Sequence, residues 1–399
     1  MHEDLMTKGT IADFDTQSAL QTICDLDFIR VCGSDGERRG LDILVRRLDA
    51  LGVGWRLHTF RDQWVTTDDP HLLVRGRKIA VQPAMEPSFR YGIDFHSDEA
   101  RQVDVQAELG RADDGPGTIA VVTEYHQEQP IVPDALAQLI VFPFEPEMEP
   151  YLWAQQEEMR QRIPVAVIAP EDIPFVISAL GEPAALRWTE RNVEGEFHNL
   201  VAEIPGTAKP DEIVVMSAHL DSFPGTVGAS DDAAGCAVLL EAAKWFANHP
   251  PARTVRLLWF TGEEVDARGS RAYLRDCVEE PSAIKLLVNV DSSLERQSGT
   301  FEVYTSDEDT YFWACQRLSL DGLEHFITEG GGTDARSFIA GGIPVFLVEA
   351  PCKQCPHLPD DTPENLDPQK LYFLGSVSLS AAAYAASGDM LSPAERQER

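Results

Sequence analysis

The stretch from Asp211 to Glu241 constrains the fold more than any other part of the chain. It reads DEIVVMSAHLDSFPGTVGASDDAAGCAVLLE, and its apolar run from Ile213 to Met216 is typical of a buried strand that ends at Ala218. A Gly-rich turn follows and leads into a helix. Four polar residues flank this turn: His219, Asp221, Asp231 and Asp232. Open α/β sheets bind ligands where a strand ends, and imidazole with carboxylates but no thiolate suits zinc or a similar divalent metal.

Apolar runs and helical patterns alternate from His198 to the end of the chain. Further strands are expected at 255–260, 284–290 and 343–348, and a helical face at 238–246 lies between the strand at 213–216 and the first of these. Near the start, Ser34 and Glu37 have the spacing of a capping box, and Gly52 closes the helix that follows. We therefore predict an α/β fold with a mostly parallel central sheet and helices on both faces.

Residues 65–195 have a different pattern. They contain short β-branched runs, many prolines and no long amphipathic helix, which indicates a separate, small β-rich domain inserted into the α/β domain. The expected boundaries are 1–62 for the first part of the α/β domain, 63–195 for the insertion, 196–392 for the main part and 393–399 for a tail.

The balance of charge excludes some classes of partner. The chain has 66 acidic and 33 basic residues, a formal net charge of −33, which argues against binding to nucleic acid or to a membrane. No apolar run approaches the ~18 residues of a transmembrane helix, and the first residues lack the pattern of a signal peptide. Of 7 cysteines only Cys352 and Cys355 lie close in sequence, so we expect a reduced, cytoplasmic protein.

Each predicted parallel strand delivers metal-ligand residue types at its carboxyl end. Because parallel strands place these ends on one edge of the sheet, the side chains should converge. The candidate ligands are His219, Asp231, Glu264, Asp291 and His357. Five donors exceed the three protein ligands of a single open catalytic zinc. They suit two divalent ions, zinc first among them, if one carboxylate bridges, and Asp231 in the central turn is the natural bridge.

Two further carboxylates complete the predicted site. Glu263, adjacent to a ligand but not needed as one, is the candidate general base. Asp221, two residues after His219, is placed to fix the imidazole tautomer. We expect Asp232 to act as a turn or helix N-terminal carboxylate, not as a ligand.

With these residues the chain resembles the M28 family of zinc peptidases, the aminopeptidase-like group with two co-catalytic zinc ions. The resemblance rests on HLDS, GASDDAAG, WFTGEEVDARGSRAYL, VNVDS and HLPDDTPENLDPQKL. It implies one ion on His219 and Asp291, a second on Glu264 and His357, and a bridging Asp231 whose following peptide bond is cis. It also implies Glu263 as the general base and Asp221 as the support of His219. The segment around Cys32 and the stretch HNLVAEIPGT resemble the start and the resumption of the peptidase domain. The insertion between them resembles a protease-associated domain.

One motif departs from that family. GGGTDAR at 330–336 carries Ala and Arg after the aspartate, where many members have a histidine, and is closer to a motif of the related M20 peptidases. Asp334 and Arg336 are therefore candidate substrate-binding residues, since a guanidinium suits a substrate carboxylate. The alternative for Arg336 is a structural salt bridge. We interpret the nearby Cys352 and Cys355 as a loop feature, an oxidisable clip beside the site, although C-x-x-C also suits a redox pair or half a zinc site.

These observations favour a metal-dependent exopeptidase, in the first place an aminopeptidase, that acts on a peptide or small amide. Three alternatives stay open. One is a carboxypeptidase, dipeptidase or amidohydrolase with the same site, the second a glutaminyl-cyclase-like transferase with one zinc, and the third a non-catalytic interaction protein. The pattern does not separate a monomer from a dimer, nor zinc from cobalt or manganese.

Overall fold

The structure is a computed structural model of the 399-residue chain. It describes residues 14–83, 101–111, 114, 116–122, 134–140, 163–168, 170–223, 226–296, 298–351, 357 and 360–388. The chain forms two compact units, the first made of Met1–Phe60 and Glu196–Arg399 and the second of Arg61–Gly195. Cys352, Cys355 and the predicted tail at 393–399 lie outside the described residues.

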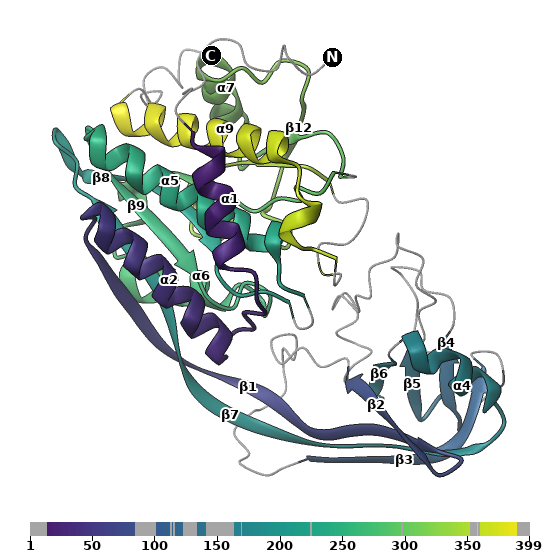
Figure 1. The fold of residues 1–399 in the computed structure, drawn as a ribbon. Helices are drawn as coiled ribbons and strands as arrows, with labels where there is room; N and C mark the ends of the chain where they lie inside the picture. The colour runs from purple at the N-terminus through teal and green to yellow at the C-terminus, as the bar shows by residue number, and fades with distance from the viewer. Residues whose placement is uncertain are drawn as a thin grey trace. The chain divides into compact units, whose positions relative to one another are not determined.

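The first unit is built on a mostly parallel sheet, as predicted (Figure 1). Its strands lie in the order β7 (Pro183–Ile204), β9 (Arg253–Phe260), β8 (Lys209–His219), β10 (Ile284–Asn289), β13 (Val345–Glu349), β11 (Glu302–Thr305) and β12 (Glu324–Ile327). The four central strands β9, β8, β10 and β13 are mutually parallel. By contrast, β7 runs antiparallel to β9 and β11 runs antiparallel to β13, while β12 is parallel to β11.

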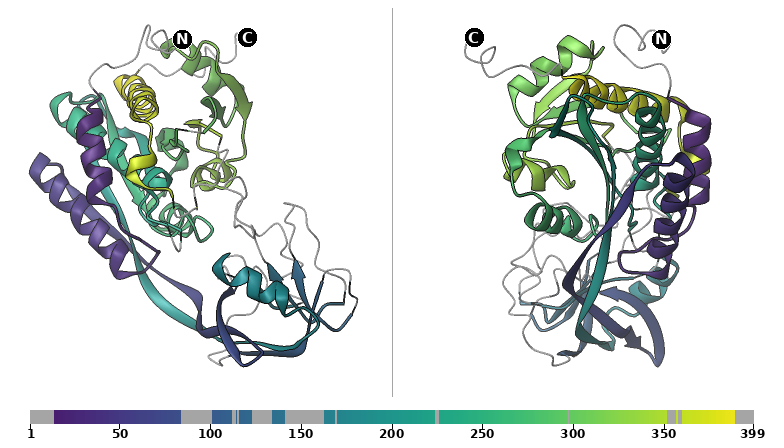
Figure 2. Two further views of the ribbon diagram at one scale, coloured as in Figure 1. Left: turned by 45° about the vertical axis from the view of Figure 1, so that its right-hand side comes forward. Right: turned by 90° about the vertical axis from the view of Figure 1, so that its left-hand side faces the viewer.

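Helices cover both faces of this sheet (Figure 2). One face packs on α1 (Thr16–Asp25), α2 (Asp35–Leu51), α5 (Ala234–Asn248), α7 (Glu308–Arg317) and α9 (Pro368–Ser387). The other face packs on α6 (Arg268–Cys277) and α8 (Ala335–Ala340). Alternation along β8 explains the two cores, because Val214 and Met216 enter the first and Val215 enters the second. The short helices η4 (Pro281–Ala283) and η5 (Pro363–Asn365) lie in connections.

The predicted capping box starts α2. The Ser34 side chain accepts a hydrogen bond from the Glu37 backbone N–H, and Glu37 Oε2 accepts one from the backbone N–H of Gly33. Gly52 ends the helix in the left-handed conformation, with φ of 68°. The second oxygen of Glu37 accepts a hydrogen bond from the hydroxyl of Thr261, just after β9. The start of α2 is thus tied to the end of a central strand.

The second unit is rich in β-structure. Its strands lie in the order β1 (Trp55–Val74), β2 (Arg77–Pro83), β6 (Val165–Ile168), β5 (Ala137–Ile140), β4 (Ile119–Val122), β3 (Arg101–Arg111) and β7. After the turn η2 (Pro170–Asp172), α4 (Ile173–Ser178) packs its Val176 into the small core. The protease-associated character of this unit stays a prediction.

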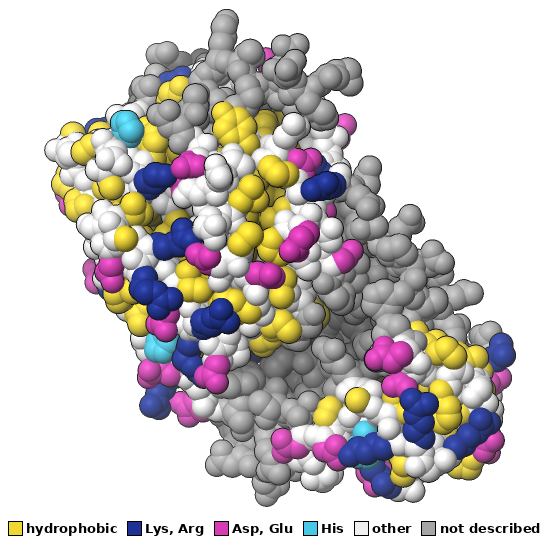
Figure 3. Space-filling view, viewed as in Figure 1, with side chains coloured by type: hydrophobic (Ala, Val, Ile, Leu, Met, Phe, Trp, Pro, Cys, Tyr) yellow, Lys and Arg dark blue, Asp and Glu magenta, His cyan; other side chains and the backbone are white. Residues whose placement is uncertain are grey.

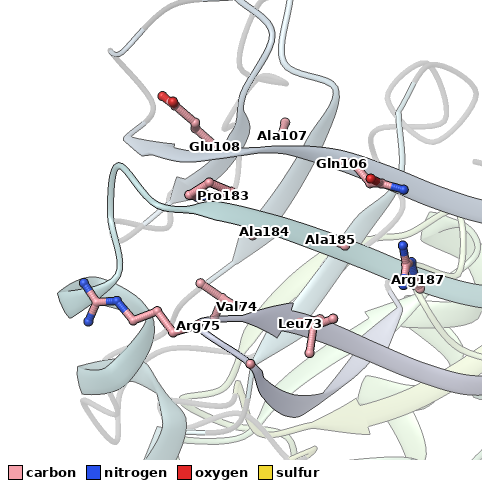
Figure 4. Close-up of a pocket in the computed structure, with 11 residues that line it drawn as sticks. Leu73, Val74, Arg75, Gln106, Ala107, Glu108, Pro183, Ala184, Ala185 and Arg187 are labelled. Carbon is pink, nitrogen blue, oxygen red and sulfur yellow. The ribbon is translucent and has the colours of Figure 1, made fainter.

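A hollow on the second unit lies among the ends of β1, β3 and β7 (Figure 4). Apolar residues such as Leu73 and Ala184 line it together with two arginines. Arg75 pairs with Glu182 and Arg187 pairs with Asp104, so both guanidiniums have carboxylate partners. None of the predicted site residues lines this hollow.

Acidic and basic side chains are interspersed over the face of the described residues drawn in Figure 3. Among the described helices, we find none with the length and apolar character that crossing a membrane requires.

Candidate metal centre

The predicted ligands lie at the carboxyl ends of the central parallel strands. His219 is the last residue of β8, and its register partner Phe260 is the last residue of β9, three positions before Glu263. Asp291 follows β10 by two residues. His357 comes from the connection that follows β13. The topology of the sheet therefore delivers residues from distant parts of the sequence to one edge.

The carboxylate of Asp231 lies between two imidazoles. Its Oδ1 is 2.8 Å from Nε2 of His219, and its Oδ2 is 2.8 Å from Nε2 of His357. Glu264 Oε2 lies 3.2 Å from the same His357 nitrogen, and Asp291 Oδ2 lies 4.0 Å from His219 Nε2. The structure thus brings all five predicted donors together and pairs them as His219 with Asp291 and His357 with Glu264, on opposite sides of Asp231.

The chemistry of this donor set fits divalent cations. Possible ligand atoms of His219, Asp231 and Glu264 all lie within 4.8 Å of one another. Burial raises the pKa of Glu264, and it raises the pKa of Asp291 well above the ordinary value. Within the described part of the chain, the buried Oε1 atoms of Glu263 and Glu264 have no hydrogen-bond partner. So many buried carboxylates are costly in the ionised state unless a cation compensates them.

The two oxygens of Asp231 are well matched to the imidazoles that flank them. Burial disfavours the charged form of Asp231, but hydrogen bonds from His219 and His357 outweigh it and lower the pKa. Burial also disfavours the charged form of His219, yet its contacts with Asp221 and Asp231 raise the pKa of this imidazole well above its usual value. In the metal-free protein, the protonated imidazole of His219 therefore supplies part of the positive charge that a bound cation would supply.

The turn that carries Asp231 is fixed from two sides. The peptide bond between Asp231 and Asp232 is cis, as the resemblance implies. Asp232 accepts hydrogen bonds from the backbone N–H groups of His219, at 3.1 Å, and of Gly235 in the first turn of α5, at 2.8 Å. It therefore acts as the predicted helix N-terminal carboxylate. On the other side, Asp361 accepts from the N–H groups of Ser230 and Asp231, at 2.7 and 3.2 Å.

Asp221 supports the site differently from the prediction. Nδ1–H of His219 donates to the backbone carbonyl of Asp221 over 3.0 Å, while the nearer carboxylate oxygen lies 3.7 Å from Nδ1. The carboxylate instead accepts from the backbone N–H groups of Glu263 and Glu264, at 3.2 and 3.3 Å. The main chain of Asp221 thus fixes the imidazole tautomer and leaves Nε2 for a metal. Its side chain holds the glutamate turn.

Comparison with known proteins gives a family match for part of the chain. Residues 199–382, a little under half of the chain, match the model of peptidase family M28. We call these residues the M28 segment, because they resemble that family. The M28 segment contains all five predicted donors together with Glu263 and Asp221, so the whole candidate centre lies inside it.

Relatives of the M28 segment carry the names of exopeptidases. The chain is 29% identical to "Aminopeptidase YwaD" of Bacillus subtilis over 198 residues, which are 46% of this chain and 43% of the relative. It is 31% identical to "Carboxypeptidase Q" of Xenopus laevis over 156 residues, which are 37% of this chain and 32% of the relative. The matches thus span less than half the length of these relatives.

Solved structures with the same fold extend over nearly the whole chain. A zinc aminopeptidase from Bacillus subtilis, called BSAP, aligns with a TM-score of 0.72 and 20% identity over 96% of this chain and 99% of its own. An aminopeptidase from Aneurinibacillus sp. strain AM-1 aligns with a TM-score of 0.65 and 21% identity over 93% and 94%. At this identity the likeness establishes the fold of the M28 segment and its surroundings.

Arg336 of the M28 segment forms a salt bridge. Its Nη2 lies 2.5 Å from Oδ1 of Asp266, and Asp266 Oδ2 lies 2.6 Å from Nη1 of Arg271. Burial raises the pKa of the neighbouring Asp334 to about 7, and its Oδ1 has no hydrogen-bond partner among the described residues. Of the two interpretations of Arg336, the structure displays the salt bridge. A contact of Arg336 or Asp334 with substrate stays a prediction.

The sequence did not predict the residues that hold the loops of the metal centre in place. Asp361 stands beside Asp360 in a polar stretch, and nothing in the pattern separates the two. Arg30 is fully buried and donates to the backbone carbonyls of Leu220, Val227 and Gly228, in the loop that precedes Asp231. The sequence shows only that Arg30 follows a short apolar run. The carbonyl groups that it binds lie about 200 positions away, so the sequence does not predict these contacts.

Proposed function

We propose that this protein is a metal-dependent exopeptidase that binds two zinc ions and acts as an aminopeptidase. The observation that carries the proposal is the position of Asp231, whose two oxygens each lie 2.8 Å from Nε2 of a different histidine. A carboxylate that faces two separate nitrogen donors suits a bridge between two ions. The family of the M28 segment supports the peptidase class, and the relatives described as zinc aminopeptidases support the metal.

In this proposal His219 and Asp291 would hold one ion, His357 and Glu264 would hold the other, and Asp231 would be shared. When bound, the ions supply Lewis-acid stabilisation of developing negative charge and favour ionisation of water. Glu263 is the proton carrier. Its Oε1 has no partner among the described residues, so it is available to take a proton from the attacking water and deliver it to the leaving amine. Burial raises the pKa of Glu263 well above its ordinary value in the metal-free protein, so this carboxyl readily holds a proton.

The charge around the centre favours a substrate with a free α-amine. Glu349, the last residue of β13, lies near enough to Asp291 for its charge to contribute to the raised pKa of that carboxyl. Asp334 adds a buried carboxylate, and the guanidinium of Arg336, whose charge acts on Asp334, is paired with Asp266. A substrate ammonium group is attracted to this surrounding, whereas a substrate carboxylate is repelled.

Carboxypeptidase or dipeptidase activity is the second candidate. The Arg336 side chain is 30% exposed despite its salt bridge, which leaves part of its guanidinium open to a carboxylate. The name "Carboxypeptidase Q" among the relatives points the same way. The two candidates differ in which end of the peptide must be free.

A single set of measurements tests the proposal. The full chain is equilibrated with zinc and freed of loose ions, and its metal content is determined. Hydrolysis of a free tripeptide, its N-acetylated form and its C-amidated form is then followed. We expect two ions per chain, cleavage of the free and C-amidated peptides, and no cleavage of the N-acetylated one. Cleavage that requires a free carboxylate identifies the carboxypeptidase. One ion per chain with cyclisation of an N-terminal glutamine identifies a cyclase-like transferase, and folded protein without metal contradicts the catalytic proposal.

A further inference from the structure

The loop from Thr261 to Gly269, which runs from the end of β9 into the first turn of α6, carries both Glu263 and Glu264. Its backbone is unusual, because Gly262, Asp266 and Ala267 all have positive φ, at 69°, 73° and 49°. The left-handed conformation is unfavourable for residues that have a Cβ atom, so two consecutive such residues persist only if the surroundings hold them. The loop therefore needs anchors outside itself.

Asn199 closes this loop at both of its ends. It is fully buried in β7, and its Oδ1 accepts a hydrogen bond from the backbone N–H of Thr261 over 3.0 Å. Its Nδ2 donates to the backbone carbonyl of Gly269 over 2.8 Å. A Cβ atom at Gly269 would lie 2.5 Å from Asn199 Oδ1 and 2.3 Å from the carbonyl oxygen of Thr261, so the contact requires glycine. One amide thus joins the first and the last residue of the loop.

A third contact fixes the orientation of that amide. The second N–H of Asn199 donates to Nδ1 of His58 over 3.0 Å, and Nε2–H of His58 donates to Asp276 over 3.3 Å. An inverted amide would direct a donor at the N–H of Thr261 and an acceptor at the carbonyl of Gly269. Only one orientation satisfies all three partners, and an aspartate cannot reproduce it because it has no N–H to donate.

We propose that Asn199 is a positioning residue for Glu263 and Glu264, which it keeps in place by clamping the ends of the loop that bears them. The proposal rests on the function proposed for these glutamates. Asp221 holds the middle of the loop through the N–H groups of Glu263 and Glu264, and Glu37 holds the Thr261 side chain. Backbone hydrogen bonds from Gly269 to Thr261, from Arg268 to Gly262 and from Ala267 to Glu263 also cross the loop. Loss of the Asn199 amide therefore does not open the loop. It leaves the N–H of Thr261 and the carbonyl of Gly269 without their side-chain partner and allows the glutamates between them to shift. Small displacements of a base or a ligand are enough to reduce turnover and metal affinity.

The test compares Asn199→Ala and Asn199→Asp with the control Asn289→Ala. Asn289 is equally buried in the neighbouring β10, but its Oδ1 accepts from Ser217 inside the sheet and it does not contact the loop. Zinc affinity is measured by competition with a chelator, and kcat and KM are measured on the free tripeptide. We expect both Asn199 variants to lose about 10–100-fold in zinc affinity at one of the sites and in kcat, with little change in KM. Asn289→Ala should lose thermal stability alone.

Equal zinc affinity and kcat in Asn199→Ala and Asn289→Ala would overturn the proposal. If neither Asn199 variant folds, His58→Phe replaces them, because it keeps a ring next to Phe60 and removes the acceptor for Asn199 together with the donor to Asp276. It should show a smaller loss in the same direction, and an unchanged zinc affinity would contradict the clamp. Failure of the proposed function would give a different result from failure of the clamp. The wild-type chain would then bind zinc without cleaving peptides, and the zinc affinities would still decide the role of Asn199.

Discussion

His219 is oriented by the main chain of Asp221, because its Nδ1–H donates to the Asp221 carbonyl oxygen over 3.0 Å while the carboxylate lies farther away. The carbonyl group of Asp221 therefore orients the imidazole, a role that a carboxylate often has, and the carboxylate of Asp221 has a separate role. A substitution at position 221 keeps the carbonyl and therefore leaves the imidazole contact in place. It removes only what the carboxylate does for the backbone of Glu263 and Glu264.

Replacement of Asp221 by Asn should therefore affect the general base more than the histidine ligand. An amide supplies one acceptor for two N–H groups and directs its own N–H at the other, which leaves a buried mismatch. We expect kcat to fall by about 10–100-fold while zinc remains at the His219 position. Turnover and metal content of the purified variant check this. Loss of the ion at His219 would show that the carboxylate does orient the imidazole.

Replacement of Glu263 by Gln should abolish turnover and retain the metal. Gln has nearly the same shape but cannot accept a proton, so kcat should fall by at least about 10²–10⁴-fold. Glu241→Gln is the matched control, since Glu241 is also a buried glutamate but pairs with Lys244 in α5. Near-normal activity in Glu263→Gln would assign proton transfer to another group.

Asp361 should matter for metal binding although it is not among the donors. Its carboxylate accepts from the N–H groups of Ser230 and Asp231 and so holds the turn of the bridging residue. Asp361→Asn is expected to weaken zinc binding by about 10–100-fold, as other supporting partners do. Asp360→Asn, the adjacent aspartate, serves as the control for the same change in charge. Equal zinc affinity in the two variants would contradict this role for Asp361.

The stability of the metal-free protein should depend on pH through Glu37. Burial, with the nearby charge of Asp221, raises the pKa of Glu37 from 4.5 to about 8. The folded state therefore holds a proton that the unfolded chain releases above about pH 4.5. The free energy of unfolding should decrease as the pH rises from 4.5 to 8, by up to about 1.4 kcal/mol per pH unit, and this contribution should be constant above pH 8.

Urea unfolding of the wild type and of Glu37→Gln between pH 5 and 8.5 measures this contribution. The variant cannot ionise, so the difference in unfolding free energy between the two proteins should change with pH and level off above 8. Parallel curves for the two proteins would mean that Glu37 titrates with its ordinary pKa.

Arg336 offers a test of substrate polarity. If its role is the salt bridge with Asp266, Arg336→Gln should reduce the free energy of unfolding by about 1–2 kcal/mol and leave the requirement for a free α-amine unchanged. Arg271→Gln is the control, because Arg271 binds the other oxygen of Asp266. A specific loss of activity on peptides with a free carboxylate, in Arg336→Gln alone, would instead support the carboxypeptidase.

The sequence predicts the ligands of this centre better than their supports. His219, Glu264 and Asp291 each follow an apolar strand, and the parallel arrangement of those strands suffices to bring the side chains together. Asn199 and Asp361 follow no such rule, because their partners are backbone groups of loops whose conformation has no sequence period. The salt bridge of Arg336 joins it to Asp266, which lies 70 positions earlier in a loop and has a left-handed conformation that the residue type does not reveal. The strand β12 has only four residues, EHFI, which are too few to show a regular apolar pattern.

The strands β1 and β7 carry the chain out of the first unit and back into it, and side chains join them where the first unit ends. Asn199 donates to His58, the Thr59 hydroxyl lies 2.9 Å from Nδ1 of His198, and the rings of Phe60 and Phe197 stack at 5.6 Å. The first unit is thus held together by side-chain contacts at the point where the chain leaves it and returns, next to the clamp on the glutamate loop. We therefore expect changes in length or sequence between 61 and 195 to leave the geometry of the metal centre unchanged.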